Sequence, residues 1–236
     1  MKKINHIQFW YCLLILCFTT NINAQNPSPA KAQSKSILIN GATVHDGIGK
    51  VYTEASVGLK DGKIIFLSYL KQGEEKYVWD TIIDAKGKHL YPGLIALNTY
   101  LGLAEIEAIR AMNDYAEVGE NNPSARSIIA YNTDSKVTPT VRSNGVLMAQ
   151  ITPQGGLISG SSSIVNLDAW NWEDAVFKAD EGIHVNWPGM RVYYGNGNEQ
   201  DEFEKKQKER INKELESIET LFADAYAYQL YAKPRS

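Results

Sequence analysis

The residues best suited to contact a ligand lie in one stretch rich in glycine and serine, residues 152–163. Five of them are assigned here to a small-molecule binding surface: Gly155, Gly156, Ser159, Gly160 and Ser161. Glycine lets a backbone approach a ligand closely, and a serine hydroxyl both donates and accepts hydrogen bonds. The stretch lacks the Gly-Lys-Ser/Thr ending of a phosphate-binding loop. A long turn without a ligand is the alternative interpretation.

The histidines do not predict a metal or catalytic site. His45 and His89 each lie beside a turn, where a histidine is more often solvated or hydrogen-bonded than a ligand. His184 has no His, Cys or carboxylate beside it at the spacing of metal ligands. The aromatic residues from Trp170 to Tyr194 are interpreted either as core or as the wall of a substrate pocket. No residue is therefore assigned a catalytic role.

Short strands are expected before these residues, at 36–44, 55–59, 63–67 and 81–85. The dipeptides Asn40-Gly41 and Asp61-Gly62 are typical of hairpin turns, so a small antiparallel sheet is predicted. The apolar runs 94–97 and 145–151 are bounded by Gly and Pro, as in strands buried on both faces. A long helix with an apolar stripe is expected from about Asp201 to Ala225.

The stretch that joins these two parts resembles the metal-dependent amidohydrolases. Their first barrel strand reads Pro-Gly-Leu-Ile-Asp-x-His-x-His-Leu-Gly, and this chain matches it at Pro92-Gly93-Leu94-Ile95 and at Leu101-Gly102. Asn98 and Tyr100 stand where that family has its two metal-binding histidines. Residues 61–64 and 83–88 are similar to the family's N-terminal segment, and residues 153–160 to a Pro-x-Gly-Gly-x-x-x-Gly loop of its imidazolonepropionase-like branch.

The resemblance implies an α/β fold in which a small N-terminal β-sandwich-like sheet precedes a TIM-type (β/α) barrel. A complete barrel takes about 250 residues, whereas residues 92–236 number 145, so the barrel is expected to be incomplete. The expected parts are a signal peptide at 1–24, a flexible leader at 25–36, the small β domain at 37–90 and the partial barrel at 91–236. The family uses zinc or another divalent metal; with Asn98 and Tyr100 at the ligand positions, no cofactor is predicted for this chain.

The N-terminus predicts export. Lys2 and Lys3 precede an apolar run at 9–18, and Ala24 ends the segment, as in a cleavable secretory signal peptide. Cleavage after Ala24 would release a periplasmic or secreted chain without cysteine, because Cys12 and Cys17 lie in the segment removed. The formal net charge of -3 argues against a nucleic-acid partner, and no membrane span is expected in the mature chain.

Three functional hypotheses follow. The first is an exported protein of the amidohydrolase family, truncated and without the His-x-His motif, whose ancestral activity is hydrolysis of C–N non-peptide bonds in amides, including cyclic ones. The alternatives are a non-catalytic binding or scaffold protein, and one half of a split enzyme or a fragment without a function of its own. The expected partners are a small amide-type ligand and either a second copy of the chain or a complementary second half.

Overall fold

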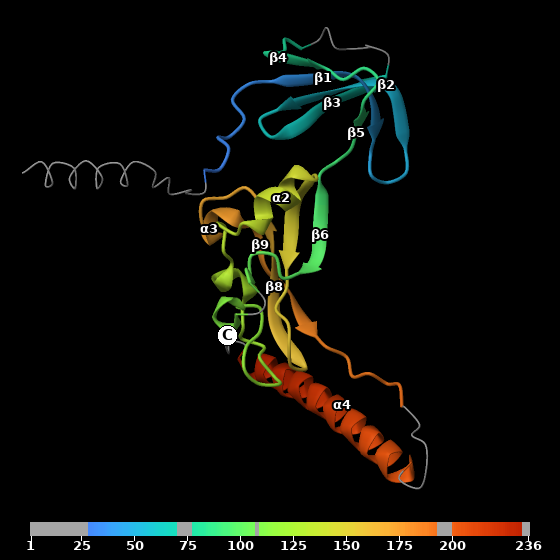
Figure 1. Cartoon of the computed structure of the whole chain (residues 1–236), viewed down its shortest axis with the longest axis vertical. Coiled ribbons are helices and arrows are strands. Elements are labelled where there is room, and N and C mark those ends of the chain that lie inside the picture. The colour runs from blue at the N-terminus through green and yellow to red at the C-terminus, as the bar shows by residue number, and fades with distance from the viewer. Residues whose placement is uncertain (1–27, 70–76, 107–108, 193–199, 233–236) are drawn as a thin grey trace, which may run out of the picture.

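Two β-sheets follow one another along the chain, and a long helix lies beyond the second sheet (Figure 1). The computed structural model describes residues 28–69, 77–106, 109–192 and 200–232. The expected signal peptide lies outside these residues. The sheets divide at residues 91–93, where the chain leaves the first sheet and enters the second.

The first sheet has the strand order β3-β2-β1-β4, with β5 also paired to β1. Its strands are β1 (Ile37–His45), β2 (Val51–Lys60), β3 (Lys63–Tyr69), β4 (Thr81–Asp84) and β5 (His89–Leu90). The strands β1, β2 and β3 are antiparallel, as the hairpin signals predict, whereas β4 and β5 run parallel to β1. Ala42, Val44, Ala55, Val57 and Ala85 form its buried core.

The two Gly-containing dipeptides have different roles in this sheet. Asp61 and Gly62 form the tight turn between β2 and β3, with φ angles of 50° and 71° that suit a two-residue hairpin. Asn40 and Gly41 do not form a turn. They lie inside β1, where the pairing with β2 shifts between Ile39 and Ala42, so they form a β-bulge.

The second sheet has the order β6-β7-β8-β9. Its strands are β6 (Leu94–Thr99), β7 (Val146–Ile151), β8 (Ile158–Asn166) and β9 (Val176–Val185). The first pair, β6 and β7, is parallel, as a (β/α) barrel requires. The next two pairs are antiparallel. Among the described residues, one strand pair of this sheet therefore has the arrangement expected of a barrel.

The expectation of a loop at residues 152–163 is wrong for its second half, because β8 begins at Ile158. Serine and glycine are uncommon in strands, which is why their density indicated a loop. Here Ser159, Ser162 and Ser163 are 1%, 0% and 0% exposed, and each hydroxyl is hydrogen-bonded inside the protein. Satisfied hydroxyls make a buried serine strand possible.

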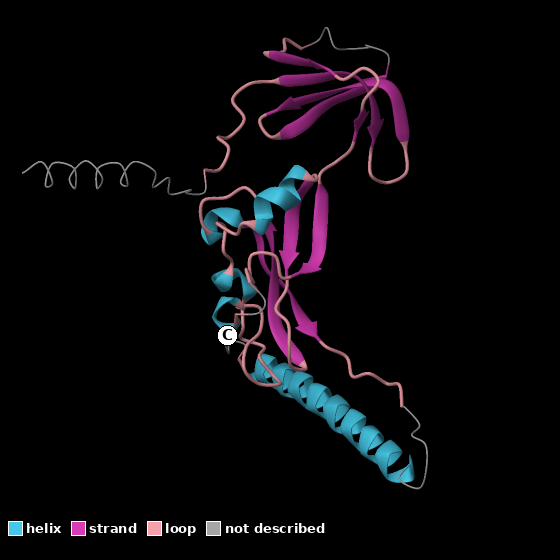
Figure 2. Cartoon of the chain, in the orientation of Figure 1, coloured by secondary structure: helices cyan, strands magenta, loops and turns pink. Residues whose placement is uncertain are grey.

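Short helical segments cover one face of the second sheet (Figure 2). They are η3 (Arg110–Met112), η4 (Ser127–Ala130), α2 (Val137–Ser143) and α3 (Trp172–Ala175). The core between them and the sheet contains Leu103, Ile128, Tyr131, Ala149, Ile151, Val165, Leu167, Ala169 and Ala175. The opposite face, which we call the open face, exposes large apolar side chains, including Leu97 at 71% and Phe177 at 67%.

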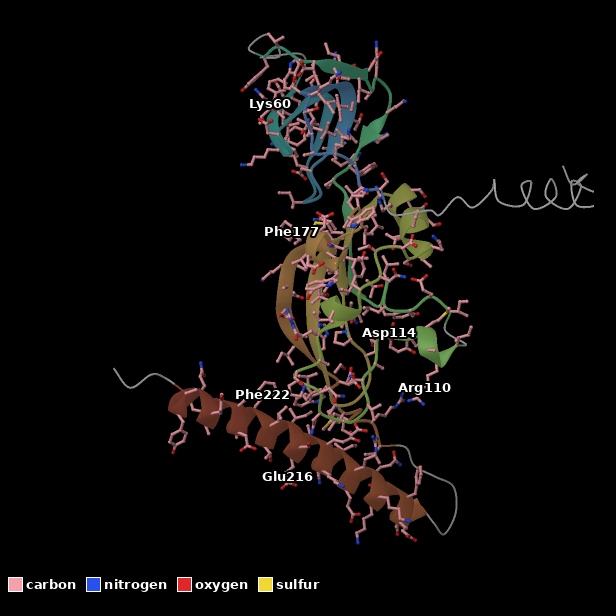
Figure 3. The ribbon with its side chains drawn as sticks, turned by 90° about the vertical axis from the view of Figure 1, so that its left-hand side faces the viewer. Lys60, Arg110, Asp114, Phe177, Glu216 and Phe222 are labelled. Carbon is pink, nitrogen blue, oxygen red and sulfur yellow. The ribbon has the colours of Figure 1, made fainter. Side chains whose placement is uncertain are left out.

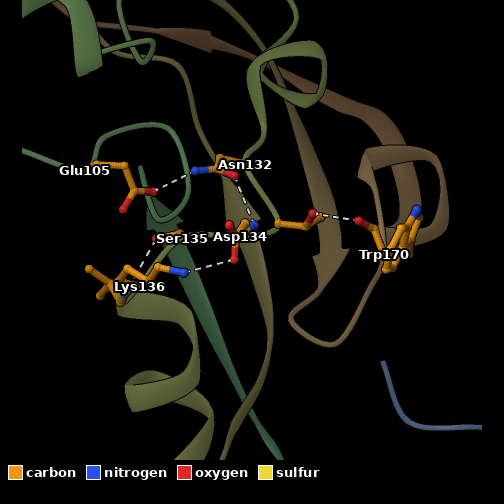
Figure 4. Close-up of polar contacts among 8 residues, drawn as sticks. Glu105, Asn132, Asp134, Ser135, Lys136 and Trp170 are labelled. Atoms are coloured by element: carbon orange, nitrogen blue, oxygen red, sulfur yellow. Dashed lines mark hydrogen bonds and ion pairs between the residues drawn. The ribbon is translucent and has the colours of Figure 1, made fainter. Parts of the chain in front are cut away.

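The turn at residues 132–136 is hydrogen-bonded to two other segments that lie against the second sheet (Figure 4). Asn132 donates from Nδ2 to Glu105 Oε1 at 3.1 Å, which links the turn to the segment that follows β6. Thr133 donates from Oγ1 to the carbonyl of Trp170 at 2.9 Å, which links it to the segment before α3. Lys136 and Asp134 form an exposed ion pair at 3.1 Å.

The helix α4 (Gln200–Tyr231) lies at the end of the molecule away from the first sheet, where Glu216 and Phe222 mark its course (Figure 3). Its apolar stripe is buried only in part: Ile211 and Ile218 are each 5% exposed, but Phe222 is 52% exposed. A hydrogen bond of 3.2 Å from Asn121 Nδ2 to Ser217 Oγ fastens it to the helical layer. None of the helices in the described ranges has the length and hydropathy of a membrane span.

Candidate functional site

Polar groups meet on the open face near the carboxyl ends of the parallel strands β6 and β7. Asn98, near the end of β6, has a left-handed backbone with φ of 49°, a conformation that asparagine tolerates better than most residues. Its backbone N–H donates to Gln150 Oε1 at 3.0 Å. Gln150 Nε2 donates in turn to Glu181 Oε1 on β9. Asn98 stands where the amidohydrolases have their first metal-binding histidine, and it is thereby connected through Gln150 to the Glu181 carboxylate.

The same carboxylate is shared with a serine and a histidine. Ser162 Oγ on β8 donates to Glu181 Oε1 at 2.9 Å and lies 2.7 Å from His184 Nε2. A hydroxyl has one proton to donate. Because Ser162 gives its proton to Glu181, His184 donates through Nε2 and is protonated at that nitrogen. We call Gln150, Ser162, Glu181 and His184 the open-face network.

Hydrogen bonding and burial set the charges of this network. Hydrogen bonds from Gln150 and then Ser162 hold the pKa of the Glu181 carboxyl below its ordinary value. Burial lowers the pKa of the His184 imidazole, and the neighbouring Glu181 carboxylate opposes that shift. At neutral pH the network is therefore an ionised carboxylate beside a neutral imidazole. Such a pair can accept a proton from a ligand and orient a polar group.

Sequence reasoning found neither Gln150 nor Glu181. Gln150 is the polar residue inside the apolar run 145–151, and Glu181 lies three residues before His184 in the sequence. The antiparallel register aligns Ser162 with Gly182, which brings Glu181 and His184 to one serine. The only signal available in the sequence was a carboxylate and an imidazole close together in one strand.

The predicted binding glycines contact another part of the backbone. A Cβ built on Gly160 would lie 2.4 Å from the carbonyl oxygen of Ala125, and one on Gly156 would lie 2.7 Å from that of Glu120. The backbone N–H of Ser161 donates to the same Ala125 carbonyl at 2.8 Å. Residues 119–125 of this chain therefore contact the glycine backbone where the sequence predicts contact with a ligand.

The remaining predicted binding residues, Ser159 and Ser161, are hydrogen-bonded to other residues of this chain. Ser159 donates from Oγ to the Gly155 carbonyl at 2.8 Å and accepts from Asn186 Nδ2 at 2.9 Å. Ser161, 8% exposed, donates weakly to Ala125 at 3.3 Å. Ligand binding by these residues stays a prediction, and the structure gives their polar groups internal partners.

A cavity of about 570 Å³ lies on the helix-covered side and includes Ser159 in its lining. Asp114 and Glu117 contribute carboxylates to it, and Arg126 contributes a guanidinium. Arg126 is held by Asp180 at 2.7 Å, and its hydrogen bond lowers the pKa of that carboxyl. Asp114 and Phe177 lie on opposite sides of the second sheet (Figure 3). The cavity and the open-face network are therefore separate regions.

The residues at the family's metal positions do not fit that metal. Asn98 offers a neutral amide, and the Tyr100 ring packs against Tyr115 at 5.4 Å between centroids. Neither supplies the imidazole that zinc prefers. Within the ranges that the structure describes, no three His, Cys, Asp or Glu side chains come together as a ligand set.

Comparison with solved structures identifies proteins of similar fold. An amidohydrolase from Thermotoga maritima is similar with a TM-score of 0.59 and 18% identity, over 85% of this chain and 52% of that chain. A molinate hydrolase matches 29% of this chain and 15% of its own at 33% identity and a TM-score of 0.25. An Aspergillus niger ochratoxinase matches 34% and 18% at 19% identity and 0.28. The last two matches are too limited to carry an argument.

No protein-family model and no curated protein matches the chain. The likeness to the T. maritima protein extends over both sheets, because it covers 85% of the residues. In its fold the chain is therefore similar to the amidohydrolases, and it spans about half the length of that neighbour.

Proposed function

We propose that this chain is an exported amidohydrolase-type protein that recognises an amide-containing small molecule. The observation that carries the proposal is the T. maritima likeness over 85% of the chain, together with a polar network near the carboxyl ends of β6 and β7. Barrel enzymes build their active sites at that end of the strands. The sequence resemblance at residues 153–160 favours the imidazolonepropionase-like branch, and the parallel strands β6 and β7 would be the first two strands of a barrel.

Glu181 is the ligand-contacting residue in this proposal. A carboxylate has about four lone-pair positions, and Gln150 and Ser162 bond to one of its oxygens. The other oxygen can accept the N–H of an amide. The carboxylate is ionised at neutral pH because its pKa is lowered. A hydrogen bond from an amide to a charged acceptor is worth about 1.5–3 kcal/mol, enough to orient a small ligand.

Hydrolysis of the C–N bond is proposed to require residues on further barrel strands, supplied by a complementary polypeptide. Asn98 and Tyr100 do not fit the family's metal, and Glu181 with His184 supplies at most a proton acceptor and a neutral donor. The chain spans about half the length of its T. maritima neighbour.

A second candidate function is ligand binding without catalysis. The cavity of about 570 Å³, with two carboxylates and Ser159 in its lining, has the volume of an ordinary small-molecule site. In this alternative the chain keeps the fold and uses the cavity instead of the open face.

The two functions are separated by ligand titration of the full mature chain. Cyclic amides and N-acyl amino acids are tested by calorimetry, and turnover is followed with and without added zinc or manganese. The matched variants are Glu181→Gln, which removes the network's charge, and Glu173→Gln on the exposed surface of α3. Binding that Glu181→Gln weakens about tenfold or more and Glu173→Gln leaves intact supports the open-face site.

Binding that neither variant changes, but that Ser159→Ala weakens, favours the cavity. Turnover that appears only when a separately expressed second half is added supports a split amidohydrolase. Absence of binding by every amide at millimolar concentration would contradict both functions.

A further inference from the structure

Two histidines that lie 44 residues apart in the sequence meet at the edge of the first sheet. His45 ends β1 and His89 begins β5. The parallel register pairs Thr43 with His89 and Val44 with Leu90. Since side chains alternate along a strand, His45 and His89 project from the same face. Their nitrogens face one another, with His45 Nε2 3.0 Å from His89 Nδ1.

That separation is the one a bound metal ion requires. An imidazole nitrogen binds zinc at about 2.0–2.1 Å, so two of them on one ion lie about 3.3 Å apart in a tetrahedron and about 2.9 Å apart at a right angle. The observed 3.0 Å lies between these values. In the structure the two nitrogens share a hydrogen bond. To bind the ion, the ring that now donates moves its proton to its other nitrogen, and the two rings turn so that both lone pairs converge on the metal.

The His45 ring is held in place before any ion arrives. It stacks on Tyr91 with a centroid distance of 4.2 Å and an interplanar angle of 11°. Pro92 follows Tyr91 and restricts the chain there. A donor whose orientation is already set loses little entropy when it binds. The pair is also accessible, because His89 is exposed and His45 is only half-buried.

The neighbouring carboxylate is engaged elsewhere. Asp46 Oδ1 accepts the backbone N–H groups of Ile48 and Lys50 at 2.9 and 3.0 Å, which closes the turn after β1. The described part of the chain brings no third His, Cys, Asp or Glu to the pair. Two imidazoles with water in the other positions favour zinc, nickel or copper over magnesium or calcium.

We propose that His45 and His89 form a two-imidazole binding site for Zn²⁺, Ni²⁺ or Cu²⁺. The site is distinct from the metal position of the amidohydrolase fold, which in this chain is occupied by Asn98 and Tyr100. It lies on the first sheet, next to residues 91–93 where the chain enters β6.

Titration of the full mature chain with ZnCl₂ and CuCl₂ tests the site. One equivalent of each ion is expected to bind in the micromolar range, and MgCl₂ is expected not to bind. His45→Gln and His89→Gln should each lower the affinity at least about tenfold, because each leaves a single imidazole. Glu173→Gln, on the exposed surface of α3 and outside both proposed sites, is the control and should retain full affinity. Circular dichroism checks that each variant is folded.

Electron paramagnetic resonance of the Cu²⁺ form gives a second readout that does not depend on affinity. Coupling to two imidazole nitrogens is expected in the wild type and to one in either variant. Zinc affinity that is the same in wild type, His45→Gln and His89→Gln would overturn the proposal. So would a wild-type protein that binds no zinc or copper at millimolar concentration.

Discussion

Asn98 stands where the amidohydrolases have their first metal-binding histidine, and its backbone conformation and hydrogen bonds decide whether a histidine could replace it. Its left-handed backbone, with φ of 49°, directs its N–H to Gln150, and Gln150 passes the connection on to Glu181. Histidine also tolerates this conformation better than most residues do. The backbone would therefore accept the family's histidine, and the question is whether an imidazole there would have partners.

We expect that restoring both histidines, Asn98→His with Tyr100→His, will not create amide hydrolase activity. Two imidazoles are at most two of the three protein ligands that a catalytic zinc usually has. The Glu181 carboxylate, which is connected to Asn98 through Gln150, already accepts hydrogen bonds from Gln150 and Ser162. The assay measures hydrolysis of cyclic amides and dipeptides with added zinc or manganese, in a His45→Gln background that removes the other proposed metal site. Turnover well above the metal-only blank would refute this expectation.

Tyr131 predicts a loss of stability at alkaline pH. It is 6% exposed in the core of the second sheet, and burial raises its pKa from 10.0 to about 12. The neutral phenol is the form favoured by the fold. Its contribution, about 2–3 kcal/mol at most, is complete below pH 10 and is lost as the pH rises from 10 to 12.

The test compares unfolding free energies at pH 9 and pH 11.5 in urea. Tyr131→Phe should reduce the alkaline loss by most of that amount, since its ring cannot ionise. Tyr228→Phe, at a residue that is 76% exposed, is the control. An identical alkaline loss in wild type and Tyr131→Phe would show that this phenol does not titrate in the unfolding equilibrium.

Strand β8 owes its position to the segment that lies against it. Residues 121 and 126 form parallel bridges to Ile158 and Ser161, and Gly160 leaves room for the Ala125 carbonyl between them. Glycine is needed at position 160 for two reasons. A side chain would collide with the Ala125 carbonyl, and the φ of +124° lies in a region that other residues avoid. The contact fixes the strand and the helical layer to each other.

Gly160→Ala should therefore destabilise the protein by about 2–3 kcal/mol, through a backbone clash and an unfavourable φ. Gly182→Ala on the adjacent strand is the matched control, because a Cβ there meets nothing within 4 Å. It should change stability by less than about 1 kcal/mol. Urea unfolding followed by tryptophan fluorescence measures both; equal effects would mean that the approach of Ala125 does not constrain β8.

Much of the secondary structure could be predicted from local sequence. The alternating runs predict β1 to β4, and the Gly- and Pro-bounded apolar runs predict β6 and β7. The expectation that these strands are buried on both faces is wrong for β6, because Ile95 and Leu97 are 53% and 71% exposed. Asn40-Gly41 is not a hairpin turn, because the left-handed backbone of Gly41 suits a bulge as well as a hairpin. What decides between the two is the pairing of β4 and β5 with β1, a non-local contact that the dipeptide does not encode.

The polar sites could be predicted much less well. Gln150, Ser162 and Glu181 come from three strands, and only the register of those strands brings them together. The serines of β8 resemble a loop in composition because their hydrogen-bond partners lie elsewhere in the chain. His45 was expected to be either solvated or hydrogen-bonded; its hydrogen-bond partner, His89, depends on the parallel pairing of β1 and β5, which the local sequence does not encode.

We expect the protein to be exported and its mature N-terminus to be Gln25, on the evidence of Lys2, Lys3, the apolar run and Ala24. Mass spectrometry of the periplasmic fraction from a bacterial host measures that N-terminus. Leu14→Arg, which interrupts the apolar run, should leave the precursor in the cytoplasm as a control. An exported protein that retains Met1 would contradict the prediction.

The parallel pairing of β6 with β7 also determines the order in which the strands can pair as the chain emerges from its N-terminal end. Leu94 pairs with Val146, so β6 is synthesised about 50 residues before its partner. At about 5–20 residues per second this delay lasts several seconds. During it, the apolar β6 has no strand to pair with, whereas the antiparallel β7, β8 and β9 can pair soon after each is made. Like the pairing of β1 with β4 and β5, closure of β6 onto β7 is thus a long-range step that is expected to be slow, and an unpaired β6 is prone to aggregate before it.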